Sequence, residues 1–134
     1  MSWKQTFILG LISTILSAIA CAIYSKIYSD AFYVDFSKIV GTINLISASA
    51  IGCFLMAIGY KLAIKWKGIK TIGWLNVVFS VLSFASIAGI LGFNLPLEIE
   101  SPEMFPGMVI PMHFFPVISL LTIYPFFKME NDHR

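Results

Sequence analysis

The sequence predicts an all-α membrane protein, a bundle of four transmembrane helices in a single domain (1–134). Hydrophobic residues make up 58% of the chain and charged residues only 12%, with a mean hydropathy of +0.87, whereas about a quarter of a soluble domain is charged. The charged residues are clustered, which leaves four long uncharged stretches, 5–25, 39–60, 71–97 and 104–127. A helix needs about 20 apolar residues to cross a bilayer, so each stretch is long enough.

Membrane-spanning strands would alternate apolar and polar positions, and none of these stretches shows that period. We therefore expect helices at about 5–27, 38–61, 70–93 and 105–127. The short connectors leave no room for a soluble domain, so any chemistry is expected within the bundle or at its mouth. The net charge of +2 is too small and too scattered to indicate a nucleic-acid partner.

The first two predicted helices carry faces of small residues. Ser13, Ser17 and Cys21 recur at four-residue spacing in the first helix, and Ser49 and Cys53 do so in the second. Small residues let helices approach closely in lipid, where burial of apolar surface gives no net drive for association. These faces predict tight helix packing and are also suited to a homo-oligomer or to contacts with other membrane proteins.

The connector after the second helix indicates the orientation. It carries Lys61, Lys65, Lys67 and Lys70 without an acid, and basic residues near membrane spans are retained in the cytoplasm. With four helices, both termini lie on the side of this connector, together with Trp74 at the start of the third helix. The opposite side collects most of the acids: Asp30, Asp35, Glu98, Glu100 and Glu103. We therefore expect a protein of the cytoplasmic (inner) membrane with both termini inside.

The fourth helix differs from the others because it contains prolines. Pro106 suits the first turn of a helix, but Pro111 and Pro116 lie inside it. Each of these removes a backbone donor and clashes with the carbonyl four residues earlier, here Gly107 and Met112. We expect a kinked outer half, in which the freed carbonyls need a partner from a neighbouring helix, a hydroxyl or water. The pattern predicts a pocket at this level.

His113 is the only Asp, Glu, Lys, Arg or His residue placed well inside a predicted span. Such residues are costly in a membrane and indicate function by default. A structural interpretation stands beside it: a neutral imidazole that bonds to a freed carbonyl or to Asn44. The candidate ligand or ion pocket consists of His113, Asn44, Met108, Met112, Gly107 and Glu103.

A soft metal site is a weaker hypothesis. Met104, Met108 and Met112 recur at four-residue spacing next to His113, and thioether and imidazole ligands favour ions such as Cu(I). Methionine is also a common filler of gaps in cores, and we expect no cofactor. Three acids at the outer mouth either attract cations or form a solvated loop: Glu98, Glu100 and Glu103.

Several function classes are disfavoured by the sequence. Cys21 and Cys53 are predicted at different depths, too far apart for a disulfide, and no CxxC pattern indicates a thiol oxidoreductase. The first helix lacks the carboxylate that small four-helix multidrug transporters use, and Walker, HExxH and GxSxG patterns are missing.

The fourth helix also carries a resemblance. Glu103, Phe105, Pro106 and the run Pro-Met-His-Phe-Phe at 111–115 resemble the closing segment of small, uncharacterised four-helix integral membrane proteins of bacteria. The resemblance covers about a fifth of the chain and implies a fold and an envelope location, but no activity.

Three functions remain in order of preference. The first is a non-enzymatic membrane protein that binds or moves a small or lipid-like ligand, or assists a membrane complex. The second is a proton- or metal-coupled transporter or channel that uses His113. The third, a membrane-embedded enzyme, is disfavoured because His113 has no evident acid or nucleophile partner at its own depth.

Overall fold

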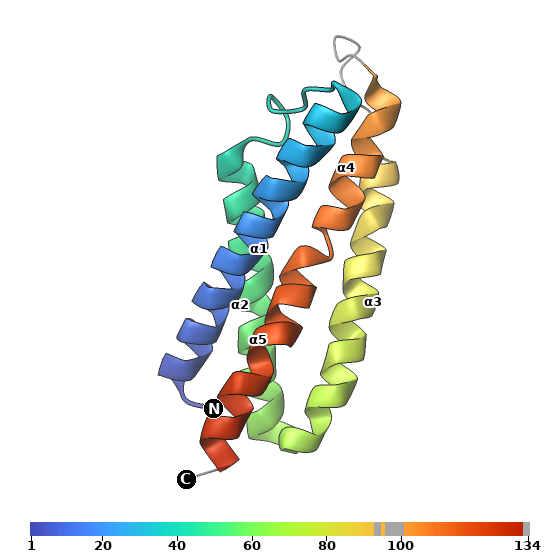
Figure 1. Cartoon of the computed structure of the whole chain (residues 1–134). Coiled ribbons are helices and arrows are strands. Elements are labelled where there is room, and N and C mark those ends of the chain that lie inside the picture. Colours follow the sequence, from blue (N-terminus) through green and yellow to red (C-terminus); the bar gives the residue numbers. More distant parts are fainter. Residues whose placement is uncertain (93–94, 96–100, 133–134) are drawn as a thin grey trace.

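The computed structural model describes residues 1–92, 95 and 101–132, and these form helices without any strand. The elements, in chain order, are α1 (Trp3–Phe32), α2 (Thr42–Lys67), the 3₁₀ turn η1 (Ile69–Thr71), α3 (Ile72–Leu91), the 3₁₀ turn η2 (Pro102–Met104), α4 (Phe105–Met112) and α5 (Phe115–Asp132). The helices lie side by side as an elongated antiparallel bundle, in which α4 and α5 together make the fourth rod (Figure 1).

Four helical segments of the described chain are long and apolar enough to cross a membrane: Trp3–Phe32, Thr42–Lys67, Ile69–Leu91 and Pro102–Phe127. This confirms the predicted all-α class and the presence of four apolar helices. The start of α1, the α2–α3 connection and the end of α5 lie at one end of the bundle (Figure 1). We call this the termini end and the opposite end the loop end.

α1 is longer than predicted at its C-terminal end. The sequence predicts that it ends near residue 27, but α1 continues to Phe32. Contacts at four-residue spacing support these extra turns: Lys26 pairs with Asp30 at 2.8 Å, and the ring of Tyr28 lies 4.6 Å from that of Phe32. The helix then stops because Tyr33 adopts a left-handed conformation, with φ of 55°.

α2 is shifted along the chain relative to the prediction of 38–61. It starts at Thr42 because the amides of Ile39 and Val40 donate instead to Phe36 O, at 2.9 and 2.8 Å, in a turn before the helix. It continues through the lysines to Lys67, and Gly68, with φ of 78°, ends it. Lysines carry long apolar stems, so a helix can continue through them where it would leave a membrane.

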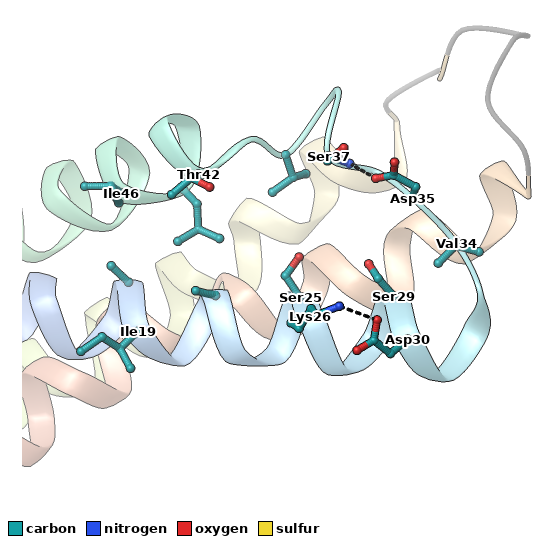
Figure 2. A pocket seen from close by; sticks show the side chains of 14 residues that line it. Ile19, Ser25, Lys26, Ser29, Asp30, Val34, Asp35, Ser37, Thr42 and Ile46 are labelled. Atoms are coloured by element: carbon teal, nitrogen blue, oxygen red, sulfur yellow. Dashed lines mark hydrogen bonds and ion pairs between the residues drawn. The ribbon is translucent and has the colours of Figure 1, made fainter.

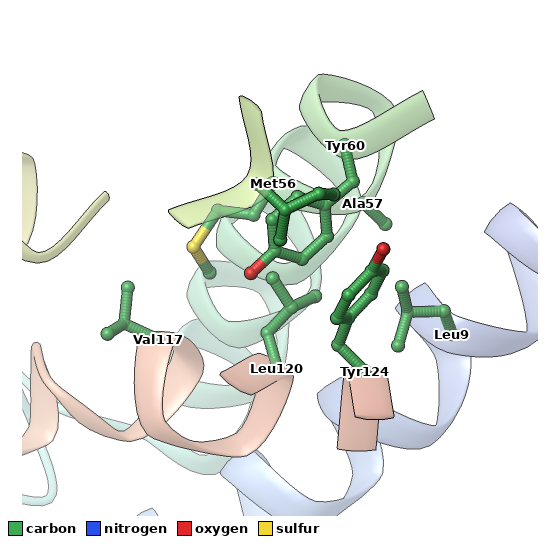
Figure 3. Packing of buried hydrophobic residues seen from close by; sticks show 8 residues of the cluster. Leu9, Met56, Ala57, Tyr60, Val117, Leu120 and Tyr124 are labelled. Carbon is green, nitrogen blue, oxygen red and sulfur yellow. The ribbon is translucent and has the colours of Figure 1, made fainter. Parts of the chain in front are cut away.

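A compact core fills the termini end. It consists of aliphatic and aromatic side chains of α1, α2, α3 and α5 (Figure 3). Tyr60 is fully buried there, contacts the rings of Phe79 and Tyr124, and donates its hydroxyl to Asn76 Oδ1. We call this set the termini-end core: Leu9, Met56, Ala57, Tyr60, Ile72, Val117, Leu120 and Tyr124.

A second core lies at the loop end. Phe36, from the connector after α1, is buried in it and meets Phe105 edge-on at 5.4 Å. Its members are Cys21, Phe36, Leu45, Ile90, Phe105, Met108 and Met112. We call it the loop-end core. The connector is therefore anchored to the bundle rather than lying free on its surface.

The small-residue faces of α1 and α2 pack against each other within the chain. Ser13, Ser17 and Cys21 are buried on α1, and Ser17 Oγ donates to Ser49 Oγ on α2 at 3.1 Å. Because the two helices are antiparallel, Cys21 and Cys53 lie on opposite sides of this hydrogen bond, each one turn away, and both are free thiols. The predicted separation of the two cysteines agrees with this register.

α3 is the least enclosed of the four spans. Its buried residues are Ile72, Ser83 and Ile90. Most of its large apolar side chains are exposed, among them Val81 and Leu82.

Candidate functional site

The fourth span is interrupted between α4 and α5. Pro111 and Pro116 have no backbone N–H, and two of the amides between them bond to carbonyls three residues back. His113 N donates to Ile110 O at 3.2 Å, and Phe114 N donates to Pro111 O at 3.1 Å. Regular helix then resumes with α5. The interruption coincides with the prolines that the sequence singles out, while the angle of the predicted kink stays a prediction.

Side chains of α1 bond to the two carbonyls that the prolines leave without an N–H partner. Tyr24 Oη donates to Gly107 O at 3.0 Å, and Cys21 Sγ makes a weak contact of 3.9 Å with Met112 O. A backbone carbonyl without a partner is costly in a membrane. The Tyr24 hydroxyl and the Cys21 thiol therefore replace the missing backbone donors on the side of the fourth span that faces α1.

α3 contacts the interruption from the other side. Ser83 Oγ donates to His113 O at 2.6 Å, and Ser86 Oγ donates to Ser83 O at the same distance. Ser83 is one of the three buried residues of α3. This hydrogen bond fixes the middle of an otherwise exposed helix to the turn between α4 and α5.

The His113 ring bonds to its own helix. Its Nδ1 lies 2.9 Å from Val109 O. A carbonyl can only accept, so Nδ1 carries the proton, and in the neutral imidazole Nε2 is left as an acceptor. Of the two partners that the structural interpretation offers, a backbone carbonyl is the one that His113 contacts. Asn44 is not its partner, because Asn44 Nδ2 donates to Ile39 O at 3.2 Å. The ring still has one nitrogen available to a ligand.

A groove with a cavity volume of about 760 Å³ runs beside this ring. Its walls come mainly from α2, α3 and the α4–α5 junction, with Cys21 of α1 and the end of the connector before α2, and they are mostly aliphatic. Ile51, Leu55 and Leu82 at its rim are 63%, 65% and 59% exposed, which shows that the groove opens sideways from the bundle. Among the described residues that line it there is no Asp, Glu, Lys or Arg. The polar groups of the lining are Asn44, Ser49, Ser83, Ser86, Cys21 and His113.

The groove brings together only part of the predicted pocket. His113, Asn44 and Met112 line it. Gly107 and Met108 instead face α1: a Cβ on Gly107 would lie 2.5 Å from Tyr28 Oη, and Met108 Sδ accepts from Ser25 Oγ at 3.8 Å.

The predicted acidic mouth is only partly described. Glu103 is exposed in η2 and does not line the groove. Glu98 and Glu100 lie outside the described residues.

Sequence reasoning missed the contribution of α3 to this site. Ser83 and Ser86 gave no signal, because serines are scattered through all four spans. A usable signal existed on α2, where the small residue Gly52 allows Pro116 to approach: a Cβ there would lie 3.4 Å from the proline Cβ. A glycine facing a proline-containing helix thus marks the wall of the groove.

The predicted methionine–histidine metal site is not assembled as a unit. Met112 lines the groove with His113, whereas Met108 is buried against Ser25 and Met104 packs beside the loop-end core. In the part of the chain that the structure describes, no group of three or more His, Cys, Asp or Glu residues is close enough to hold a metal ion. Of the predicted set only Met112 and His113 share the groove, and metal binding by them stays a prediction.

The fold and the groove define an all-α bundle whose four helices could each cross a membrane. No protein-family model, curated protein or solved structure matches this chain. The resemblance to small bacterial four-helix membrane proteins therefore stays a prediction.

Proposed function

We propose that this chain is a multi-pass protein of the cytoplasmic membrane that binds a lipid-like ligand in the groove between α2, α3 and the α4–α5 junction. The observation that carries the proposal is the groove itself, of about 760 Å³. Its uncharged, mostly aliphatic lining is typical of a site for an apolar molecule. In a bilayer its lateral opening would face the acyl chains, so a lipid-like ligand could enter without crossing water.

One end of the ligand would contact a polar group. His113 Nε2 is an acceptor while Nδ1 is held by Val109 O, so the proposed ligand carries a hydroxyl or an amide N–H near one end of its apolar body. The interruption between α4 and α5 lies at this level, beside the groove. The role is binding or transfer of the ligand, or presentation of it to a membrane complex, and no bond is made or broken.

The proposed orientation places the termini end in the cytoplasm. Lys61, Lys65 and Lys67 lie in the last turns of α2 and Lys70 lies in η1, and the α2–α3 connection is at that end (Figure 1). Basic residues near membrane spans are retained on the inner side. Trp3, Trp66 and Trp74 are exposed there, and Lys61 Nζ lies 3.9 Å from the ring centre of Trp3. Exposed tryptophans at one end of the bundle suit the membrane interface. A reporter fused to the C-terminus is expected to be active only inside, and activity outside would overturn this orientation.

The test of the groove uses a fluorescent polyene fatty alcohol as the probe and the purified chain in detergent micelles. Leu82→Trp places a large ring at the rim of the groove, whereas Val81→Trp places the same ring on the adjacent exposed position of α3, which does not line it. We expect L82W to weaken probe binding about tenfold, equivalent to about 1.4 kcal/mol, and V81W to leave it unchanged. Equal binding by both variants would refute the groove as the site.

A second variant tests the polar contact. His113→Ala is expected to weaken binding of the fatty alcohol several-fold but not that of an alkane probe of equal length, because only the alcohol has a hydrogen to donate. Loss of binding to both probes would indicate that the ring shapes the groove without contacting the ligand. The proposed polar contact would then be wrong.

A metal- or proton-coupled transporter is the second candidate. It is supported by Cys21, Met112 and His113, a thiol, a thioether and an imidazole that line one groove. The test of metal binding compares the copper and zinc content of the purified native chain with that of His113→Ala. A metal that co-purifies with the native chain at one ion per chain, and not with the variant, would favour transport over lipid binding.

A further inference from the structure

A second cavity, of about 640 Å³, lies between the last turns of α1, the 33–41 connector and the start of α2 (Figure 2). Its lining changes along its length. Ile19 and Ile46 mark an apolar end, and charged and hydroxyl side chains gather at the other end (Figure 2). The polar set is Ser25, Lys26, Ser29, Asp30, Asp35 and Ser37.

The connector that roofs the polar end is held in place. Val34 N donates to Ser29 O at 3.2 Å and turns the chain back after α1. Phe36 is only 2% exposed and anchors the connector in the loop-end core. Asp35 Oδ1 accepts from Ser37 N at 2.8 Å, so both residues have fixed positions above α1. The cavity is therefore built by defined contacts.

The cavity spans the level at which a bilayer changes from apolar to polar. α1 has 30 residues, which corresponds to a length of about 45 Å, against about 30 Å for the hydrocarbon core and about 40–45 Å for the bilayer with its headgroups. The last turns of α1, which carry Lys26 and Asp30, therefore reach headgroup depth. Ile19 lies two turns deeper, among acyl chains.

The charges of the cavity select among headgroups. Lys26 Nζ lies 2.8 Å from Asp30 Oδ1, and all three charged residues of the lining are exposed to an incoming molecule. Hydrogen bonds from the Ser37 side chain and backbone lower the pKa of Asp35, which keeps it ionised. One lysine and two aspartates line the cavity, and Lys38 acts on Asp35 from outside the lining. A headgroup whose only charge is a phosphate brings no cation to the two aspartates, so it pairs with fewer groups of the lining than a zwitterionic headgroup does.

A zwitterionic headgroup matches this arrangement. Its phosphate can pair with Lys26 and the serine hydroxyls, while a primary ammonium can donate to two carboxylates. A quaternary ammonium cannot donate, and it is usually recognised by aromatic rings. The described residues that line the cavity include no aromatic side chain.

We propose that this cavity binds a bilayer phospholipid with a phosphoethanolamine headgroup. The phosphate lies at Lys26, and the ammonium lies between Asp30 and Asp35. The acyl chain leaves along Ile19 and Ile46. Val40 and Leu45 line both cavities, but the polar groups differ: Lys26, Asp30 and Asp35 line only this cavity, and His113 lines only the groove.

The test is native mass spectrometry of the purified chain in detergent with three phospholipids of identical acyl chains, carrying phosphoethanolamine, phosphocholine or phosphoglycerol headgroups. The phosphoethanolamine lipid is expected to bind about fivefold more tightly than the other two. Lys26→Gln and Asp35→Asn should each remove most of this preference. Lys4→Gln and Glu103→Gln are matched controls, because both residues are exposed and neither lines the cavity.

Equal binding of the three lipids by the native chain would overturn the proposal, as would a preference for phosphoglycerol. Water-soluble glycerophosphoethanolamine is the second arm. If it competes as well as the full lipid, the apolar end is unused and the membrane lipid is the wrong ligand. Circular dichroism and size-exclusion profiles identify any variant that fails to fold, and in that case the comparison of lipids on the native chain still decides.

Discussion

The two ends of this bundle are stabilised by different interactions. At the termini end, aliphatic and aromatic side chains from four helices fill a single core, with Tyr60 and Leu120 fully buried. From the middle of the bundle toward the loop end, hydroxyl and thiol groups bond to backbone carbonyls around the interruption of the fourth span, and two cavities lie along α2 between Thr42 and Met56. The comparison shows that the termini end is built for packing, whereas the loop end leaves space beside polar groups.

The largest effect is expected from a cavity in the termini-end core. Leu120→Ala removes a side chain with no exposed surface and should lower the free energy of unfolding by about 2–5 kcal/mol. Ile118→Ala, on the same helix but 52% exposed, should change it by less than about 0.5 kcal/mol. Unfolding in mixed detergent micelles, followed by circular dichroism, measures both. Similar losses for the two variants would contradict the assignment of this core.

A smaller loss is expected at the loop end from Gly107→Ala. The new methyl would lie 2.5 Å from Tyr28 Oη, which donates to Met104 O at 2.8 Å and is therefore not free to move. Such overpacking should cost about 1–3 kcal/mol. Gly89→Ala is the control, because nothing lies within 4 Å of its added methyl. Because alanine has the better helix propensity, Gly89→Ala should not lower the free energy of unfolding. Destabilisation by both variants would rule out the clash with Tyr28 as the cause.

Removal of one buried hydroxyl at the termini end should have a moderate effect. Tyr60→Phe keeps the ring contacts with Phe79 and Tyr124 but deletes the hydrogen bond to Asn76. Hydrogen bonds between transmembrane helices contribute about 0.6 kcal/mol on average and up to about 1.7. Tyr33→Phe, at a position that is 94% exposed, should leave the melting temperature in detergent unchanged. A shift no larger than that of this control would show that packing alone stabilises this end.

The smallest effect is expected for Ser83→Ala, which removes the hydrogen bond between α3 and His113 O. We expect a loss of about 0.6 kcal/mol and faster hydrogen exchange across α3, since few other buried residues hold this helix. Ser80→Ala is the control, because its hydroxyl bonds to Asn76 O of the same helix. Unchanged exchange in Ser83→Ala would mean that α3 is attached by its apolar contacts alone.

The interruption of the fourth span follows from local chemistry and could be predicted. Pro111 and Pro116 cannot donate, whatever surrounds them. The partners of the freed carbonyls could not be predicted, because Tyr24 and Cys21 are far away in sequence. The sequence also could not predict that Met112 lines the groove while Met108 contacts α1. That difference depends on the register of α1 against α4.

The sequence by itself determined the number of apolar helices, the placement of both chain ends at one end of the bundle, and the position of the helix break. These properties depend on the length and hydropathy of each stretch and on prolines, which act locally. Only the tertiary structure decided which face of each helix is buried, and hence where Ser83, His113 and the two cavities lie. The physical reason is that lipid accepts apolar side chains as readily as a protein interior does, so hydropathy does not distinguish the inner face of a helix from the outer one.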